Sequence, residues 1–293
     1  MFKNNNRFTV GGKECSSLIA KRLISAMSIA SSPYTKDSLK KRIINILKCG
    51  NQSITYHKVN KGVFFCNDIL CPKCRNRNNQ KFYAENKNIL NQRLKESTDN
   101  KFAFLTLTIK NAKCCNLGVA ISSMNSAWGK VYKHFNGKKG EKKLFLGYIK
   151  RLELTVGKNR NSEQEMHPHF HLIVDLGSNS CFDDVNFFDQ LESEIRQQWQ
   201  KELHIDYEPQ IAIKYIIDGD INEKFKKLMD FNSYISKNLH SFDVNGLDDI
   251  NFLRVLEEVK WRRFKSRGGN LGKISKELKE NFRKEKRCRY CKD

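Results

Sequence analysis

Residues 167–174, HPHFHLIV, restrict the fold of this chain more than any other stretch, because three histidines alternate there with other residues and lead into an apolar run. Successive side chains of a β-strand point to opposite faces, so His169 and His171 should share one face while Phe170 and Leu172 share the other. Two imidazoles two residues apart on a strand can bind one metal ion when a third donor lies nearby. The chain has 7 histidines. Three of them fall within five residues, which favours a metal site over two ordinary surface histidines.

The charge of the chain indicates a polyanionic partner. Lys and Arg number 54 against 32 Asp and Glu, a formal net charge of +22, and nucleic acid is the commonest polyanion that such a field attracts. No apolar run approaches the roughly 18 residues of a membrane-spanning helix, and no signal sequence is recognised. We therefore expect a cytoplasmic protein without a membrane partner. The 10 cysteines are then expected to be metal ligands or free thiols rather than disulfides.

Between residues 101 and 245 the hydrophobic pattern switches repeatedly between the periods of strands and helices. Strands are predicted at 102–110, 146–156, 167–174 and 209–217, and helices at 117–135, from Asp183 or Asp184 onward, and at 222–240. The order β-α-β-β-α-β-α is that of a ferredoxin-like split βαβ unit with one added helix, an α+β fold with an antiparallel sheet. In that topology the first and third strands are central, and the second lies beside the third.

The predicted sheet has one apolar and one polar face. The apolar face carries side chains that the crossover helices would cover: Leu105, Leu107, Leu152, Leu154, Phe170 and Leu172. The opposite face would carry Thr106, Thr108, Glu153, Thr155, His169 and His171. Two histidines and one glutamate on an open sheet face of a basic protein indicate an active site.

The last helix of this region supplies a candidate nucleophile. Asp230, Tyr234 and Lys237 are spaced so that they share one helical face. A tyrosine oxygen can attack phosphorus when a metal polarises the phosphate and a cation lies close by. The alternative is an ordinary half-buried helix tyrosine. Tyr215, in the fourth predicted strand, is expected to pack rather than react.

Four cysteines upstream form a second candidate metal site. Cys71-x2-Cys74 has the knuckle spacing with which two thiolates bind one tetrahedral zinc, and Cys66 and Cys49 can complete the set. Such a Zn²⁺ site is structural rather than catalytic. A further C-x2-C pair at 288–291 leaves open a second zinc shared between two chains, and with it a homodimer.

Basic side chains in the segments before and after the predicted sheet region of the sequence are candidates for contacts with DNA phosphates. A polar, basic helix is predicted from residue 75 to about 95, and a basic amphipathic helix over 253–264. The candidate contacts are Arg75, Arg77, Lys81, Arg262 and Arg263. A solvated charged face is the ordinary alternative for such segments.

The chain is predicted to have three parts. Residues 1–100 form an N-terminal helical, zinc-binding region, 101–245 the catalytic domain, and 246–293 a basic helical C-terminal extension. Within the extension, a break is expected at Arg267–Gly269, followed by a charged helix over 274–286.

These motifs, in this order, resemble those of the HUH endonucleases and, within them, the rolling-circle replication initiators of small bacterial plasmids. The family's first motif is similar to the strand FLTLT at 104–108, the second to His169-Phe170-His171, and the third, a Tyr-x-x-Lys helix, to residues 234–237. The subfamily with an upstream cysteine cluster also has a strand similar to GYIKRLELT at 147–155. The resemblance spans roughly residues 45–270.

The resemblance implies a DNA nickase that works through a phosphotyrosine. Glu153, His169 and His171 would hold Mg²⁺ or Mn²⁺, and Tyr234 would attack the scissile phosphate at a plasmid origin, giving a 5′-phosphotyrosine and a free 3′-OH primer. Lys237 would stabilise charge on the phosphate. The implied partners are origin DNA, single- and double-stranded and including a hairpin, together with a host helicase and polymerase.

One residue departs from the family pattern. Single-tyrosine members use a glutamate one turn before the tyrosine to activate a second attacker at termination, and that position is Asp230 in this chain. The aspartate is shorter by one methylene. An aspartate paired with Lys226 or Lys227 on the helix surface is the alternative to a catalytic one.

Three other functions remain open at this point. A conjugative relaxase of the same superfamily usually has a third metal-binding histidine, which would have to be His167. A single-strand transposase is usually smaller and lacks the cysteine cluster. A non-catalytic origin-binding repressor would not need an intact set of metal ligands and nucleophile.

Overall fold

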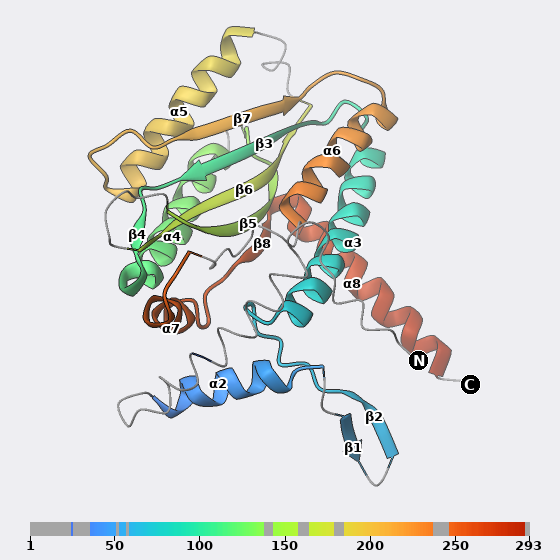
Figure 1. The fold of residues 1–293 in the computed structure, drawn as a ribbon. Helices are drawn as coiled ribbons and strands as arrows, with labels where there is room; N and C mark the ends of the chain where they lie inside the picture. Colours follow the sequence, from blue (N-terminus) through green and yellow to red (C-terminus); the bar gives the residue numbers. More distant parts are fainter. Residues whose placement is uncertain are drawn as a thin grey trace.

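The computed structural model describes Ser25 and residues 36–50, 53–56, 59–137, 143–157, 164–178, 185–236 and 246–290. Its strands are β1 (Ser53–Tyr56), β2 (Val59–Val63), β3 (Lys101–Thr108), β4 (Ala112–Lys113), β5 (Gly147–Val156), β6 (Glu165–Gly177), β7 (Ile211–Ile216) and β8 (Lys265–Gly268). Its helices are α2 (Asp37–Lys48), α3 (Pro72–Glu96), the 3₁₀ turn η1 (Cys114–Asn116), α4 (Leu117–Asn136), α5 (Val185–Leu203), α6 (Ile221–Ser236), α7 (Asp249–Glu258) and α8 (Gly269–Tyr290). The arrangement is shown in Figure 1.

A six-stranded sheet in the order β7-β3-β6-β5-β8, with β4 paired to β6, organises the described residues. All of its pairings are antiparallel. The first and third strands predicted from the sequence, β3 and β6, are central, and the second, β5, lies beside β6. The mixed α/β architecture with an antiparallel sheet is therefore confirmed. β1 and β2 form a separate hairpin.

Helices cover both faces of the sheet (Figure 1). On one face α4 and α5 pack against the apolar side chains of β3, β5 and β6, in the core that includes Leu105, Leu152 and Phe170, and α7 joins this core by packing against α4 and η1. On the other face α3, α6 and α8 pack over Phe102, Ile149, Ile173 and neighbouring apolar side chains at one end of the strands. The far end of this second face carries the polar side chains of the candidate site.

The helices follow from hydrophobic spacing. In α4, Leu117, Ile121, Met124, Trp128 and Val131 recur every three or four residues, and all five are buried, as expected for a helix with one face toward the core. α4 begins at Leu117, as the sequence predicts, and α5 lies within the second predicted helix, whose predicted start at Asp183 or Asp184 is outside the described residues. No described helix is long and apolar enough to span a bilayer.

The C-terminal region differs from the prediction. The helix expected over 253–264 is α7 at Asp249–Glu258, and strand β8 at Lys265–Gly268 overlaps the expected break at Arg267–Gly269. β8 pairs with β5, with Lys265 opposite Arg151. The four residues of β8, KSRG, show no alternation of apolar and polar side chains. They form a strand because they pair with β5, not because of a strand-like sequence.

Gly269 makes the turn from β8 into α8 sterically allowed. Its φ of +56° lies in the left-handed region, and a Cβ there would approach the Leu146 carbonyl oxygen to 2.1 Å, which no other residue type could accept. Residues 265–290 therefore contribute an edge strand and a covering helix to the sheet. The three-part division of the chain stays a prediction, with this segment attached to the six-stranded sheet.

Candidate metal centre and nucleophile

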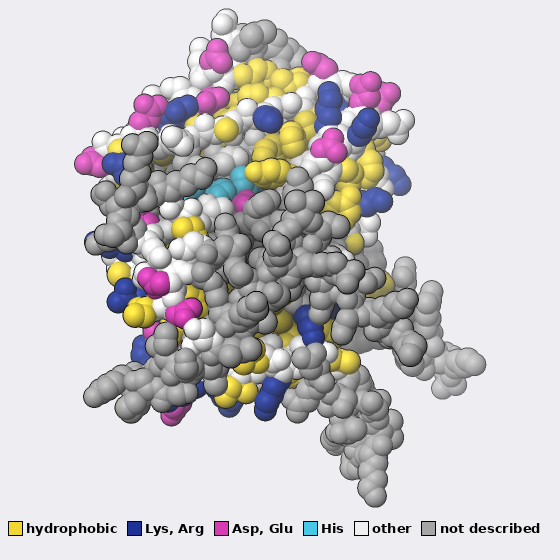
Figure 2. Space-filling model, viewed as in Figure 1, with side chains coloured by type: hydrophobic (Ala, Val, Ile, Leu, Met, Phe, Trp, Pro, Cys, Tyr) yellow, Lys and Arg dark blue, Asp and Glu magenta, His cyan; other side chains and the backbone are white. Residues whose placement is uncertain are grey.

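Strand register brings the predicted metal ligands together on one face of the sheet. Glu153 of β5 lies opposite His169 of β6, and His171 lies opposite Thr106 of β3. Glu153 Oε2 is 2.8 Å from His171 Nε2 and 3.4 Å from His169 Nε2. The three ligand atoms all lie within 4.8 Å of one another. Histidine side chains reach the surface on the face shown in Figure 2.

The Nδ1 atoms of His169 and His171, which point away from Glu153, have partners that orient the two rings. His171 Nδ1 is 3.1 Å from the Thr106 hydroxyl, and His169 Nδ1 is 3.3 Å from the His167 carbonyl oxygen. A ring that donates from Nδ1 presents the lone pair of Nε2. Without an ion, Nε2 of His171 is hydrogen-bonded to the Glu153 carboxylate, and Nε2 of His169 lies close to it. When the ring protons are on Nδ1, the two Nε2 atoms and the carboxylate are three ligands directed at one position, so these residues fit a divalent metal ion.

The protonation states also suit metal binding. Burial opposes ionisation of Glu153, but hydrogen bonds to His169 and His171 outweigh it and hold the pKa of Glu153 at about 2. Burial lowers the pKa of His171, against the effect of its hydrogen bond to Glu153. At neutral pH the site therefore offers an ionised carboxylate and a neutral imidazole, the forms in which these groups bind metals.

His167 does not join this group. It is half-buried, its Nδ1 lies 3.0 Å from Asn111 Oδ1, and its ring centroid is 5.3 Å from that of His169. Its ligand atoms are outside the set that lies within 4.8 Å. The arrangement of described residues thus lacks the third metal-binding histidine that the relaxase alternative would require.

Tyr234 lies against the histidine pair. Its ring is edge-on to His171, with centroids 4.9 Å apart, and edge-on to Phe104 at 5.6 Å. The side chain is 46% exposed, so its oxygen remains accessible to a substrate. Burial, followed by the negative charge of Glu153, raises the pKa of Tyr234. The phenol is therefore protonated at neutral pH.

The other two residues of the predicted helical face have different outcomes. Asp230 is exposed, and among the described residues no ion pair joins it to Lys226 or Lys227. Lys237 lies outside the described residues, as does the predicted end of this helix at His240.

Helix α6 is held in place by polar contacts that sequence reasoning missed. Asn232 is buried and bonds to both the Asn86 side chain and the Tyr83 carbonyl of α3, each at 3.0 Å. Arg151 Nη1 donates to the Ile235 carbonyl oxygen at 2.7 Å, next to Tyr234. Arg151 is two residues before Glu153, so strand alternation could have placed it on the catalytic face. Its contact with α6 could not be foreseen from spacing.

Tyr215 packs on the opposite face. Its ring lies 4.3 Å from that of Phe188, and its hydroxyl donates to the Phe188 carbonyl oxygen at 3.4 Å. Burial raises the pKa of Tyr215. This residue packs against the core under α5, on the face of the sheet opposite to the candidate metal ligands.

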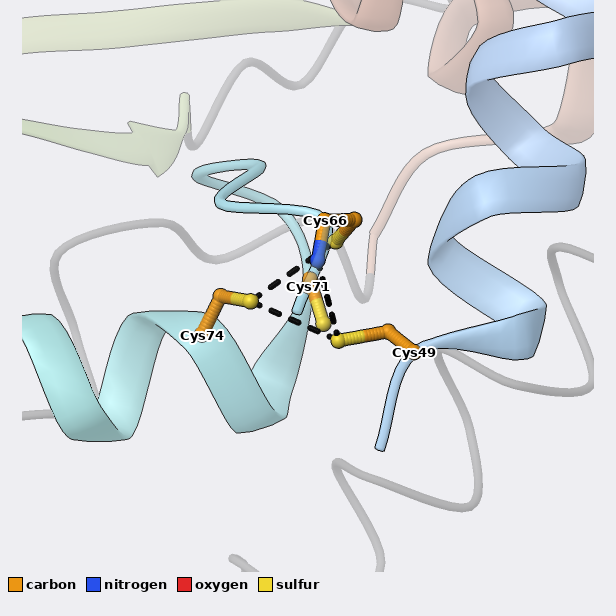
Figure 3. A group of neighbouring side chains, drawn as sticks. All are labelled: Cys49, Cys66, Cys71 and Cys74. Carbon is orange, nitrogen blue, oxygen red and sulfur yellow. Dashed lines mark hydrogen bonds between the residues drawn. The ribbon is translucent and has the colours of Figure 1, made fainter. Parts of the chain in front are cut away.

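The four upstream cysteines converge as predicted (Figure 3). Cys49 follows α2, Cys66 and Cys71 lie in the segment between β2 and α3, and Cys74 is in the first turn of α3. Cys49 Sγ and Cys66 Sγ lie 3.4 and 3.7 Å from Cys74 Sγ. Four sulfurs bound at about 2.3 Å to a tetrahedral zinc would lie about 3.8 Å apart, so the spacing fits that ion.

Backbone amides contact two of the sulfurs, and the pKa shifts of the thiols differ: a hydrogen bond with Cys71, together with burial, raises the pKa of Cys66, and burial raises the pKa of Cys74 to about 12. The Cys66 amide donates to Cys49 Sγ at 3.4 Å, and the Asn67 amide donates to Cys74 Sγ at 3.2 Å. A hydrogen bond with Cys66, opposed by burial, lowers the pKa of Cys71 to about 6. A Cys₄ cluster can therefore hold a metal ion. Of the second pair, Cys291 and the side chain of Cys288 lie outside what the structure describes.

The predicted DNA-contacting side chains are in varied positions. Arg75 is buried and faces a cavity beside the catalytic face, and Lys81 is exposed at the same cavity. Arg77 stacks over Phe65 at 4.6 Å. Arg262 and Arg263 are exposed. Their DNA contacts stay a prediction.

We predict one tightly bound zinc per chain at the cysteine cluster. Cys71→Ser should lose the zinc and lower the thermal unfolding midpoint by at least about 5 °C, because the α2 segment would no longer be tied to α3. Elemental analysis and a thermal melt measure the two effects. Cys115→Ser, at an exposed cysteine outside the cluster, is the control. Folded wild-type protein without zinc would contradict the assignment.

The chain was also compared with known proteins. The model of the Rep_1 replication protein family matches residues 57–290. A Rep protein of Lactiplantibacillus plantarum is 26% identical over 251 residues, which cover 84% of this chain and 76% of the relative. A Rep protein of Lentilactobacillus hilgardii is 26% identical, covering 76% of this chain and 68% of the relative.

A third relative is matched over a shorter segment. The Rep protein of Streptococcus pneumoniae serotype 2 is 28% identical over 153 residues, 52% of this chain, and the match spans a little less than half of the relative, 45%. No solved structure matches. Because the family model covers most of the chain, including β3 to β8, the protein belongs to the Rep_1 family of replication proteins.

Proposed function

We propose that this protein initiates rolling-circle replication of a plasmid by cutting one DNA strand at the origin. The observation that carries the proposal is the contact of the Tyr234 ring with His171, 4.9 Å between centroids, beside a Glu153/His169/His171 group suited to a metal ion. Membership of the replication protein family supports it. The strand order β7-β3-β6-β5 supports the ferredoxin-like fold of HUH endonucleases.

In the proposed cleavage step, Tyr234 Oη forms a bond to the scissile phosphorus and the bond from phosphorus to the 3′ oxygen breaks. The tyrosine loses its proton and the 3′ oxygen gains one. The phosphate keeps its bond to the 5′ oxygen of the downstream nucleotide and is now also bonded to Tyr234, which makes the 5′-phosphotyrosine. A Mg²⁺ or Mn²⁺ ion held by Glu153, His169 and His171 would polarise the phosphate. Lys237 would stabilise the charge that develops there.

The charge of Glu153 links metal binding to the nucleophile. In the described structure this charge raises the pKa of Tyr234, which disfavours the phenolate. Neutralising the carboxylate with a bound cation removes that effect, so the tyrosine becomes easier to deprotonate when the site is complete. His171 contributes twice, as a metal ligand and as the surface against which the Tyr234 ring is positioned.

Asp230 is proposed to act in the second strand transfer, which ends the cycle. It is exposed on α6 one helical turn before Tyr234, so both side chains share a face. Among the described residues no ion pair joins it to Lys226 or Lys227, so its carboxylate could accept a proton from a water or a DNA hydroxyl. The partners of the whole cycle would be origin DNA, a host helicase and a host polymerase.

Tyr234→Phe should abolish covalent attachment to an origin oligonucleotide, because only the nucleophilic oxygen is removed. Equilibrium binding should change by no more than about twofold, since loss of one exposed hydroxyl costs about 0.5 kcal/mol or less. Denaturing gels measure the adduct, and fluorescence anisotropy measures binding. Tyr215→Phe is the control and should form the adduct. The reverse pattern would show that the nucleophile is wrongly assigned.

The metal site gives a prediction that does not depend on cleavage. Wild-type protein should bind one Mn²⁺ in the Glu153 site, and His171→Ala should weaken that binding by at least about tenfold. Electron paramagnetic resonance during a Mn²⁺ titration measures it. His134→Ala is the control, since this histidine pairs with Glu194 on the surface. EDTA should stop nicking, and full activity in metal-free buffer would refute a metal-dependent reaction.

Asp230→Ala should cut at near wild-type rate and then accumulate covalent complexes, because the second attacker is no longer activated. Asp230→Glu should preserve release. A pulse of labelled oligonucleotide followed by an unlabelled competitor measures the lifetime of the adduct. Glu223→Ala, two turns earlier on α6, controls for the loss of a negative charge. Release by Asp230→Ala as fast as by wild type would make the carboxylate structural.

A further inference from the structure

A basic cavity of about 890 Å³ lies beside the catalytic face, between α3, β8 and the start of α8. Nine of the side chains that line it are Lys or Arg, and among the described residues that line it one, Glu85, is acidic. Pockets that hold small ligands span about 300–1,000 Å³. The cavity is therefore large enough for one or two nucleotides and too small for a turn of duplex.

Several of these cations are deeply placed. Arg151 and Arg75 are 4% and 5% exposed, and Lys265 and Arg267 project from β8 beside them. Burial, with the charges of Arg151 and Arg267, lowers the pKa of Lys265 to about 7. Glu85 bonds to Arg267 at 2.9 Å, and Arg267 Nη2 is buried without a hydrogen-bond partner among the described residues. Clustered buried cations repel one another unless an anion compensates them.

The cavity is suited to phosphate rather than to a base. Its two aromatic rings, Phe82 and Phe264, are 5% and 7% exposed. Phe82 is already covered by Lys265 Nζ and Arg267 Cζ, each 4.8 Å from the ring centroid. No exposed aromatic side chain among the described lining residues is free to stack on a base. Charged side chains would bind a sugar–phosphate backbone without reading its sequence.

Arg151 connects this cavity to the nucleophile. It lines the cavity, donates to the carbonyl oxygen of Ile235 at 2.7 Å, and pairs across the sheet with His171 on one side and Lys265 on the other. It also lies two residues from Glu153 on the same face of β5, a distance of about 7 Å at the usual rise of a strand. A DNA strand bound at Glu153 and Tyr234 would thus have the cavity directly beside it.

We propose that the cavity binds the phosphates of single-stranded DNA next to the scissile phosphate, an inference that rests on the proposed function. A single strand can bend into the space between α3, β8 and α8, whereas base-paired DNA cannot enter it. The same chemistry would accept a free nucleotide or pyrophosphate, so the experiment has to separate these sources.

The test uses the full chain with Tyr234→Phe as background, so that binding is measured without cleavage. Lys265→Gln removes a deep cation but keeps a donor for its present partners, the Asn78 carbonyl oxygen and Asn79 Oδ1. Lys276→Gln removes an exposed rim cation with little risk to folding. Each should weaken binding of a single-stranded oligonucleotide about tenfold. Each lost phosphate contact should reduce the salt dependence by about 0.7 in log–log slope.

The controls are charge-matched. Lys95→Gln on α3 and Arg283→Gln on α8 remove one exposed positive charge from the same helices, outside the cavity, and should change binding less than about twofold. Circular dichroism and thermal melts establish that every variant is folded. If the cavity variants bind the oligonucleotide as tightly as these controls, the inference is overturned.

Competition distinguishes the strand from a free ligand. Pyrophosphate and a deoxynucleoside triphosphate should displace the oligonucleotide only at concentrations at least about a hundredfold above its own dissociation constant. Tight binding of either one, lost in Lys265→Gln while oligonucleotide binding is unchanged, would make this a nucleotide site and refute the proposal. Failure of the wild type to form an adduct would refute the proposed cleavage but leave these binding results unaffected.

Discussion

The antiparallel pairing of β5 with β6 is the constraint on which the rest of the structure depends. Its ten residue pairs place Glu153 opposite His169 and Leu152 opposite Phe170. A slip of one residue would turn every side chain to the other face. The apolar layer and the candidate metal ligands are therefore specified together, because burying Leu152 and Phe170 under α4 and α5 directs Glu153 and His169 to the opposite side.

The sequence-based predictions succeed where the signal is local and periodic. Alternation in β5 and β6 is enough to place Glu153, His169 and His171 on one face, and the knuckle spacing of Cys71 and Cys74 is enough to suggest a cluster. The strand order follows from the order of elements. These features need only the two-residue and 3.6-residue periods of strands and helices.

The predictions fail where a residue depends on a distant partner. β8 has no apolar alternation and is a strand because the edge of β5 is available, so its sequence indicates a break instead. Arg151 becomes a neighbour of Tyr234 only because α6 returns across the sheet and presents the Ile235 carbonyl oxygen to it. The orientation of Tyr234 against His171 likewise depends on buried Asn232 and Asn86, which hold α6 to α3.

The position of β8 after all the other strands of the sheet has a consequence for synthesis on the ribosome. Until residues 265–268 have been translated, the outer edge of β5 exposes unpaired backbone amides and carbonyls, which can pair with other chains. The neighbouring strands β3, β6 and β7 precede β8 in the chain, so an incomplete sheet with the candidate metal ligands in register can form first. The nascent protein would thus have an assembled candidate site while its sheet edge is still open to misassembly, and β8 and α8 close that edge afterwards.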